Sequence, residues 1–164
     1  LKHNTNRYQI PIIYVNQVGG NDDLIFDGCS VVFNSAGNVI YRAQAFETNL
    51  AIVEFNCAKK DLISVNLENI NFPETEEQEI WSALVLGLKD YVYKCGFSKV
   101  VLGLSGGLDS ALVAAIATAA LGKENVLAIL MPSPYSSDHS VKDALELAEN
   151  LGIAKQIILS LIHI

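Results

Sequence analysis

The sequence predicts an α/β protein in which a β-rich first third is followed by a parallel-sheet layer. Two observations carry this prediction. Residues 1–56 contain several short β-prone runs and no helical pattern. From residue 74 onward, helical periodicity alternates with short apolar runs. The order strand, helix, strand, helix, strand is typical of a right-handed parallel sheet. Between the two parts, residues 57–73 lack apolar periodicity and carry several asparagines, which indicates a linker.

The first third is predicted to be almost entirely β-structure. A loop is expected at 17–23, where glycines and acidic turn residues gather, and a hairpin turn at 35–38. No helix is predicted in this block, and it buries too little surface to be stable alone. We therefore expect it to form one side of a larger sheet domain. The predicted strands cover residues 10–15, 31–33, 39–43 and 50–55.

The second part begins with a helix. Thr75 and Gln78 have capping-box spacing, and a stripe of apolar residues continues to Val92, which indicates contact with a core. The next helix is apolar on every side and should be buried. Ser140 and Asp143 repeat the capping spacing at the start of a third helix. The later elements are expected as strands at 98–104, 126–131 and 156–159 and helices at 110–121 and 140–151.

The turn between the first of these strands and its helix is the main candidate site. Gly103 to Gly107 places backbone N–H groups and the positive end of a helix dipole around one point, which suits a phosphate. Ser105 and Ser110 add hydroxyl donors, and Asp109 is a candidate ligand for the Mg²⁺ that accompanies a polyphosphate. The alternative is a tight turn whose glycines only permit close packing. The lysine of a P-loop is missing, and Leu108 stands where a dinucleotide fold has its third glycine.

The string Ser105-Gly-Gly-Leu-Asp-Ser110 resembles the pyrophosphate loop of the N-type ATP pyrophosphatases, which use ATP to adenylate a substrate. A second loop, at 131–140, resembles the Met-Pro-Ser-x-Tyr-Ser-Ser segment of glutamine-dependent NAD synthetases, although Pro134 stands where many members have arginine. An ordinary Pro/Ser connection is the alternative for that loop. The resemblance implies a Mg²⁺ ligand at Asp109 and ATP-binding residues Gly103, Leu104, Ser105, Gly106, Gly107, Leu108, Asp109, Ser110, Leu130 and Met131, the last two beside the adenine.

Residues 14–30 carry a further resemblance. Their Asn-x-Val-Gly-Gly and Phe-Asp-Gly-x-Ser patterns are similar to the late strands of the nitrilase-like glutaminase domain of the same synthetases. The implied fold is the tail of a nitrilase-like αββα sandwich over 1–56, the linker, and the first part of a Rossmann-like adenine nucleotide alpha hydrolase-like domain over 74–164. The family's Glu-Lys-Cys triad would precede Leu1. Cys29 is a poor substitute, since it has no adjacent base, and is interpreted as a small buried hydrophobe.

The resemblance implies ATP-dependent amidation of deamido-NAD to NAD, with ATP and Mg²⁺ as cofactors and ammonia from glutamine. The full-length protein is expected to be a homo-oligomer, and this chain, which is expected to be cut at both ends, to be inactive as a glutaminase and weak or inactive as a synthetase. Another ATP-pyrophosphatase amidotransferase, such as a GMP synthetase, and a non-catalytic nucleotide-binding fragment stay open as alternatives.

Composition agrees with a small-molecule enzyme. The 164 residues are 51% hydrophobic and 18% charged, which is sufficient for a core. A net charge of −7 argues against binding to nucleic acid, and the apolar runs are too short for a membrane span. The cysteines Cys29, Cys57 and Cys95 and the three histidines show no metal-ligand spacing, which is typical of a reducing cytoplasm.

Overall fold

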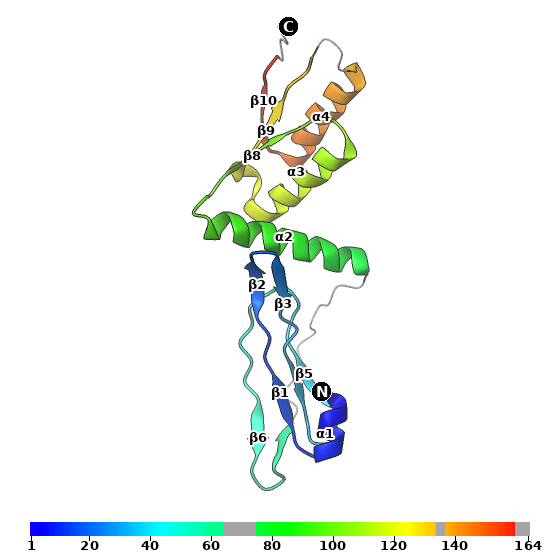
Figure 1. The fold of residues 1–164 in the computed structure, drawn as a ribbon, viewed down its shortest axis with the longest axis vertical. Helices are drawn as coiled ribbons and strands as arrows, with labels where there is room; N and C mark the ends of the chain where they lie inside the picture. Colours follow the sequence, from blue (N-terminus) through cyan, green and yellow to red (C-terminus); the bar gives the residue numbers. More distant parts are fainter. Residues whose placement is uncertain (64–74, 134–136, 160–164) are drawn as a thin grey trace. The chain divides into compact units, whose positions relative to one another are not determined.

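The computed structural model describes residues 1–63, 75–133 and 137–159 (Figure 1). These residues form two compact units, Leu1–Ala83 and Leu84–Ile164. Most of the expected linker, the position of Pro134 and the last five residues of the chain lie outside the described residues. No helix in the described part combines the length and the apolar character that a membrane crossing requires.

Unit 1 is a set of short antiparallel strands. A three-stranded sheet has the order β1-β4-β5, and two hairpins pair β2 with β3 and β6 with β7. The turn 35–38 joins β4 to β5 as predicted. The elements are α1 (Lys2–Tyr8), β1 (Ile12–Tyr14), β2 (Val18–Asn21), β3 (Leu24–Asp27), β4 (Val31–Phe33), β5 (Val39–Arg42), β6 (Glu54–Asn56) and β7 (Asp61–Ile63).

A small core and one polar contact hold unit 1 together. Val32, Ile40 and Leu62 form a buried cluster that joins the sheet to β7. Beside it, the Asp61 carboxylate accepts hydrogen bonds from the Ser35 hydroxyl at 2.7 Å and the Ser35 backbone N–H at 2.8 Å. These bonds stabilise the carboxylate and lower the pKa of Asp61. The hairpin β6–β7 is thereby fixed to the turn between β4 and β5.

Four expectations for unit 1 were wrong. β2 lies in the expected loop at 17–23 because its glycines pair with β3, with Gly20 opposite Ile25. The helix α1 was not predicted, since its seven residues are polar and show no apolar stripe. The strand expected at 50–55 begins only at Glu54. β7 lies inside the expected linker because Leu62 is buried against the sheet.

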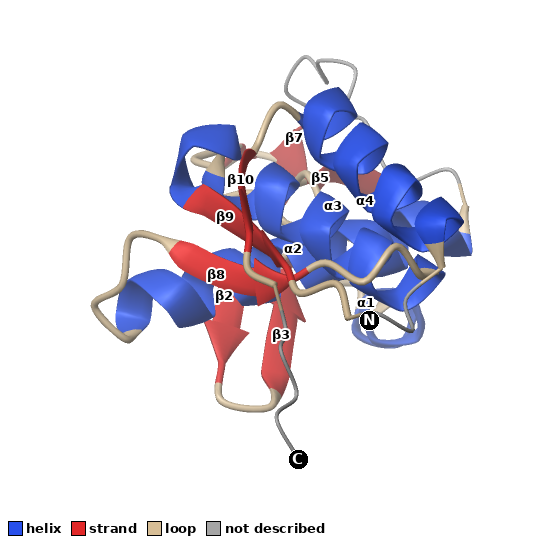
Figure 2. Ribbon diagram, turned by 90° about the horizontal axis from the view of Figure 1, so that it is seen from above, coloured by secondary structure: helices blue, strands red, loops and turns tan. Residues whose placement is uncertain are grey.

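Unit 2 contains a parallel sheet, which confirms the predicted α/β layer. The strand order is β10-β9-β8, and both pairs are parallel. Figures 1 and 2 show α3 and α4 side by side on one face of this sheet. The elements from α2 onward are α2 (Glu76–Lys94), β8 (Val100–Gly103), α3 (Leu108–Leu121), the 3-10 helix η1 (Lys123–Asn125), β9 (Val126–Leu130), α4 (Asp138–Leu151) and β10 (Ala154–Ile157).

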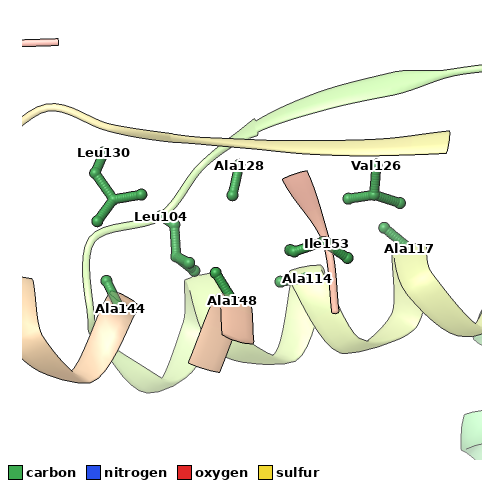
Figure 3. Close-up of a cluster of buried hydrophobic side chains, with 9 residues drawn as sticks. All are labelled: Leu104, Ala114, Ala117, Val126, Ala128, Leu130, Ala144, Ala148 and Ile153. Atoms are coloured by element: carbon green, nitrogen blue, oxygen red, sulfur yellow. The ribbon is translucent and has the colours of Figure 1, made fainter. Parts of the chain in front are cut away.

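Small side chains bring the two helices close to the sheet. On β9, Val126, Ala128 and Leu130 point toward α3 and α4, where they meet alanines of both helices (Figure 3). Ala128 is fully buried, and its methyl group leaves no room for a larger side chain. The remaining members of the cluster are Leu104, Ala114, Ala117, Ala144, Ala148 and Ile153.

One prediction for the helices is confirmed and three are not. The backbone N–H of Gln78 donates to Thr75 Oγ1 at 3.3 Å, so the capping of α2 by Thr75 is confirmed. The apolar stripe of α2 is buried only in part, because Trp81 remains 38% exposed. α3 is not buried all round, since Leu112 and Val113 are about half exposed. α4 is capped by Ser137 rather than Ser140, because Ser137 has the extended backbone that an N-cap requires.

The packing of Ala128 generates a stability prediction. We expect Ala128→Leu to lower the free energy of unfolding by about 1–3 kcal/mol, because the added carbons must displace α3 or α4. Urea unfolding followed by circular dichroism measures the change. Ala154→Leu is the matched control, since Ala154 lies on the neighbouring strand β10 but is exposed, and its effect should stay within about 0.5 kcal/mol. Equal effects of the two substitutions would contradict the close packing of β9.

Candidate functional site

The candidate site lies at the carboxyl end of β8. The N–H of Leu104 donates to the carbonyl of Ile129 at 2.9 Å, which extends the parallel pairing by one residue. Leu104 is also buried in the core of unit 2, so the chain leaves the sheet at a fixed point. The following residues do not continue as strand or begin as helix until Leu108. Residues 104–107 therefore form a loop between a strand and a helix, as predicted.

Two serines organise this loop. Ser110 Oγ accepts a hydrogen bond from the Ser105 N–H at 3.2 Å and donates to the Gly107 carbonyl at 3.0 Å. The Ser105 and Ser110 hydroxyl oxygens lie 2.9 Å apart. Because the proton of Ser110 is directed to Gly107, the hydroxyl of Ser105 donates to Ser110. Ser105 Oγ in turn accepts from the Gly107 N–H at 3.3 Å. The hydroxyls thus fold the loop over the start of α3.

The first turn of α3 supplies unpaired donors beside this loop. The first intrahelical bond runs from the Ala111 N–H to the Gly107 carbonyl at 3.1 Å. The N–H groups of Leu108, Asp109 and Ser110 precede it and have no acceptor within the helix. Gly107 is the N-cap and offers no side-chain cap. These N–H groups, together with the helix dipole, form a positive region at the loop.

Gly106 is where the loop touches α4. Its φ of +84° is a left-handed conformation that favours glycine. A Cβ added there would lie 2.0 Å from the carbonyl oxygen and 2.9 Å from the Cα of Ser140. No side chain fits between these two backbones. Gly107 is different, since its φ is −86° and the nearest atom to an added Cβ is 3.5 Å away.

A pocket of about 350 Å³ opens beside the loop. It brings together five of the residues predicted to bind ATP, namely Gly103, Leu104, Ser105, Leu130 and Met131. The other five, from Gly106 to Ser110, are not among its lining residues and lie along the loop and the first turn of α3. The sequence analysis missed several further lining residues, which come mostly from the packing of α4: Ile129, Pro132, Ser137, Ser140, Val141 and Ala144.

The charge around the pocket is low. None of the described residues that line it is charged, so an anion there would depend on backbone N–H and hydroxyl donors. Asp109 is exposed in the first turn of α3, next to these donors. Among the described residues no three acidic, histidine or cysteine side chains gather as a metal cage. A single carboxylate does fit Mg²⁺ that is bound mainly by phosphate oxygens and water.

Unit 1 has its own pocket of about 350 Å³, and Cys29 is one of its lining residues. Burial raises the pKa of the Cys29 thiol, and the nearby Asp27 carboxylate raises it further. Both effects favour the protonated thiol, which is a weak nucleophile. The side chain of Asp27 is itself engaged, since it accepts a hydrogen bond from Asn16 Nδ2 at 2.9 Å. The surroundings of Cys29 therefore do not activate it for attack on an amide.

Comparison with known sequences identifies one family over the part of the chain that contains the glycine loop and the loop after β9. A sequence model described as NAD synthase matches residues 80–161, half of the chain. The chain is 58% identical over 158 residues to a glutamine-dependent NAD(+) synthetase of Synechocystis sp., and the match covers 96% of this chain and 28% of that protein. A protein of the same name from Thermotoga maritima is 41% identical, with 92% of this chain and 31% of that protein covered. The chain thus spans less than a third of these relatives.

Solved structures match the chain across both units. The glutamine-dependent NAD+ synthetase of Acinetobacter baumannii, in complex with ADP, has a TM-score of 0.87 and 44% identity, covering 96% of this chain and 30% of that one. A synthetase of the same kind from Cytophaga hutchinsonii has a TM-score of 0.73 at 21% identity and shows the shared fold. The predicted fold class is confirmed by these matches. With its glycine loop, its parallel sheet and a family match over half its length, the chain belongs to the NAD synthase family.

Proposed function

We propose that this chain is the nucleotide-binding part of a glutamine-dependent NAD synthetase. The reaction is the amidation of deamido-NAD to NAD. The nicotinate carboxylate attacks the α-phosphate of ATP, which releases pyrophosphate and leaves an acyl-adenylate. Ammonia then displaces AMP and forms the amide. The observation that carries the proposal is the loop 104–107, which places the start of α3, with its N–H groups that lack an intrahelical acceptor, beside a pocket at the carboxyl edge of a parallel sheet.

The residues of the loop would act by electrostatic stabilisation. Negative charge builds on the pyrophosphate as it leaves, and donors that are already oriented stabilise it without reorganisation. The N–H groups of Leu108, Asp109 and Ser110 are such donors, whereas the hydroxyl protons of Ser105 and Ser110 are engaged within the loop and hold its shape. Mg²⁺ held by Asp109 would supply additional positive charge to the phosphates. The Acinetobacter baumannii relative was solved in complex with ADP, which supports binding of an adenine nucleotide by this chain.

The pocket would take the adenosine portion of ATP. Its lining combines apolar side chains such as Val141 and Ala144 with the backbone at the end of β9. Leu130 is buried and gives the pocket a rigid floor, whereas Met131 is 59% exposed at its rim. The described lining carries no charge and is partly apolar, which suits a planar base more than a phosphate. The predicted placement of Leu130 and Met131 near the adenine is consistent with this division.

The remaining parts of the proposal rest on the family. Residues 1–63, which include β7, would be the end of a nitrilase-like glutaminase domain, and residues 74–164 the first part of the synthetase domain. Glutamine would be hydrolysed by a cysteine outside this chain, since Cys29 is not activated. The three cysteines are free, which supports a reducing cytoplasm. We further propose that the protein of the relatives' length is a homo-oligomer.

The decisive test is the reaction itself. A protein of the relatives' length that carries this chain is assayed for ATP-dependent conversion of deamido-NAD to NAD, with glutamine or ammonia as the nitrogen source. XMP replaces deamido-NAD in a parallel assay, because a GMP synthetase would use it. NAD formation supports the proposal. Activity on XMP alone, or nucleotide binding without either reaction, would replace it with one of the two alternatives.

Because Gly106 lies so close to Ser140, we expect a side chain at position 106 to weaken nucleotide binding. We expect Gly106→Ala to weaken MgATP binding to the 164-residue chain at least about tenfold, because the loop must move away from Ser140. Isothermal titration calorimetry measures the dissociation constant. Gly96→Ala is the matched control, since Gly96 has a similar φ of +81° but no atom within 4 Å of an added Cβ. If Gly106→Ala binds MgATP as tightly as Gly96→Ala does, the loop is not the phosphate site.

The carboxylate of Asp109 predicts a dependence on magnesium. In the unsubstituted chain Mg²⁺ should tighten ATP binding, and in Asp109→Asn this gain should be lost while metal-free ATP binding persists. The gain would be lost because Asp109 would hold the Mg²⁺, and the ion would supply positive charge to the phosphates of ATP. Asp143→Asn, an equal charge change at an exposed position of α4, serves as the control. A full magnesium gain in Asp109→Asn would remove Asp109 from the proposed site.

In protein of the relatives' length, Asp109→Asn should also abolish ATP–pyrophosphate exchange and leave glutamine hydrolysis intact.

A further inference from the structure

The first turn of α4 packs directly against the glycine loop, residues 104–107. Gly106 meets the backbone of Ser140 so closely that no Cβ fits between them. Ser105 from the loop and Ser137 and Ser140 from α4 also line the same pocket. The position of this turn therefore fixes both the direction of the loop and the width of the pocket. A displacement of Ser140 would open space at Gly106 and free the loop to change its conformation.

Ser137 holds this turn in place. Its Oγ accepts a hydrogen bond from the Ser140 N–H at 3.2 Å, and the hydroxyl oxygens of Ser137 and Ser140 lie 2.8 Å apart. The Ser137 carbonyl accepts from the Val141 N–H at 3.4 Å. One turn further on, Ala144 is buried in the core of unit 2 and anchors the helix. The segment between Ser137 and Ala144 is thus fixed at one end by a cap and at the other by packing.

We propose that Ser137 is a positioning residue for the nucleotide loop, and this inference rests on the proposed function. By capping α4, Ser137 keeps the Ser140 backbone against Gly106, and the loop in turn keeps the N–H groups of Ser105 and Gly107 in their present directions. The side chain acts through the helix and the loop. Any side chain that caps equally well should therefore replace serine, whether or not it has a hydroxyl group.

Amide hydrogen exchange of the 164-residue chain, followed by NMR, tests the coupling without any nucleotide. We expect Ser137→Ala to raise the exchange rates of the Leu104, Ser105 and Gly107 amides about five- to tenfold, as an N-cap is lost and the open population grows. Ser137→Asn should restore the slow exchange. Thr75→Ala is the matched control, because it removes the cap of α2 and should leave the loop amides unchanged.

The outcomes separate the inference from the proposed function. Faster exchange confined to α4 in Ser137→Ala, with an unchanged loop, would overturn the coupling, as would an equal effect of Thr75→Ala. In a second arm, MgATP is added to each variant. Protection of the loop amides by MgATP that is weakened in Ser137→Ala and restored in Ser137→Asn supports the inference. Absence of protection in every variant, including the unsubstituted chain, would overturn the proposed nucleotide site, while the exchange data without nucleotide would still decide the coupling.

Discussion

The candidate site depends on the backbone contact between Gly106 and the first turn of α4. An added Cβ at Gly106 would overlap the Ser140 carbonyl oxygen at 2.0 Å, so the two segments are too close for any side chain at this position. Glycine permits both the left-handed φ and the short separation. This contact turns the loop after β8 toward the start of α4, and the pocket forms where they meet. The proposed nucleotide site therefore depends on backbone geometry more than on a charged side chain of the described lining.

The sheet and the core of unit 2 hold the two segments of this contact in position. Parallel pairing of β8 with β9 brings the ends of both strands to one edge of the sheet, with Gly103 opposite Ile129. Alanines on α3 and α4 pack against Ala128, so the helices lie close enough to the sheet for their first turns to meet the loops. A pocket whose described lining is uncharged then lies beside N–H groups with no intrahelical acceptor. This combination suits a ligand with a planar base and a charged phosphate chain.

The sequence predicted the features of the site that depend on local chemistry. The glycines after β8 and the apolar runs of the parallel strands predicted the parallel sheet and the loop between its first strand and the following helix, as observed. Features that depend on distant contacts were missed. β2 forms because β3 pairs with it, and nothing in its Gly-rich sequence favours a strand. The sequence predicted Ser140 as the cap of α4, whereas the extended backbone at Ser137 makes that residue the cap. The exposed face of α3, with Leu112 and Val113, could not be predicted from sequence. A helix that is apolar on every side does not show which of its faces the neighbouring elements cover.

The most direct test of the account is a titration of the 164-residue chain with MgATP, recorded as ¹H–¹⁵N chemical shifts. We expect the largest shift changes at the amides from Ser105 to Ser110, with smaller changes at Ile129 and Val141, which line the pocket. Pyrophosphate alone should change the chemical shifts of the loop amides and leave those of the pocket residues unchanged. Shift changes that spare residues 105–110, or that fall mainly in unit 1, would contradict the assignment of this loop as the phosphate site.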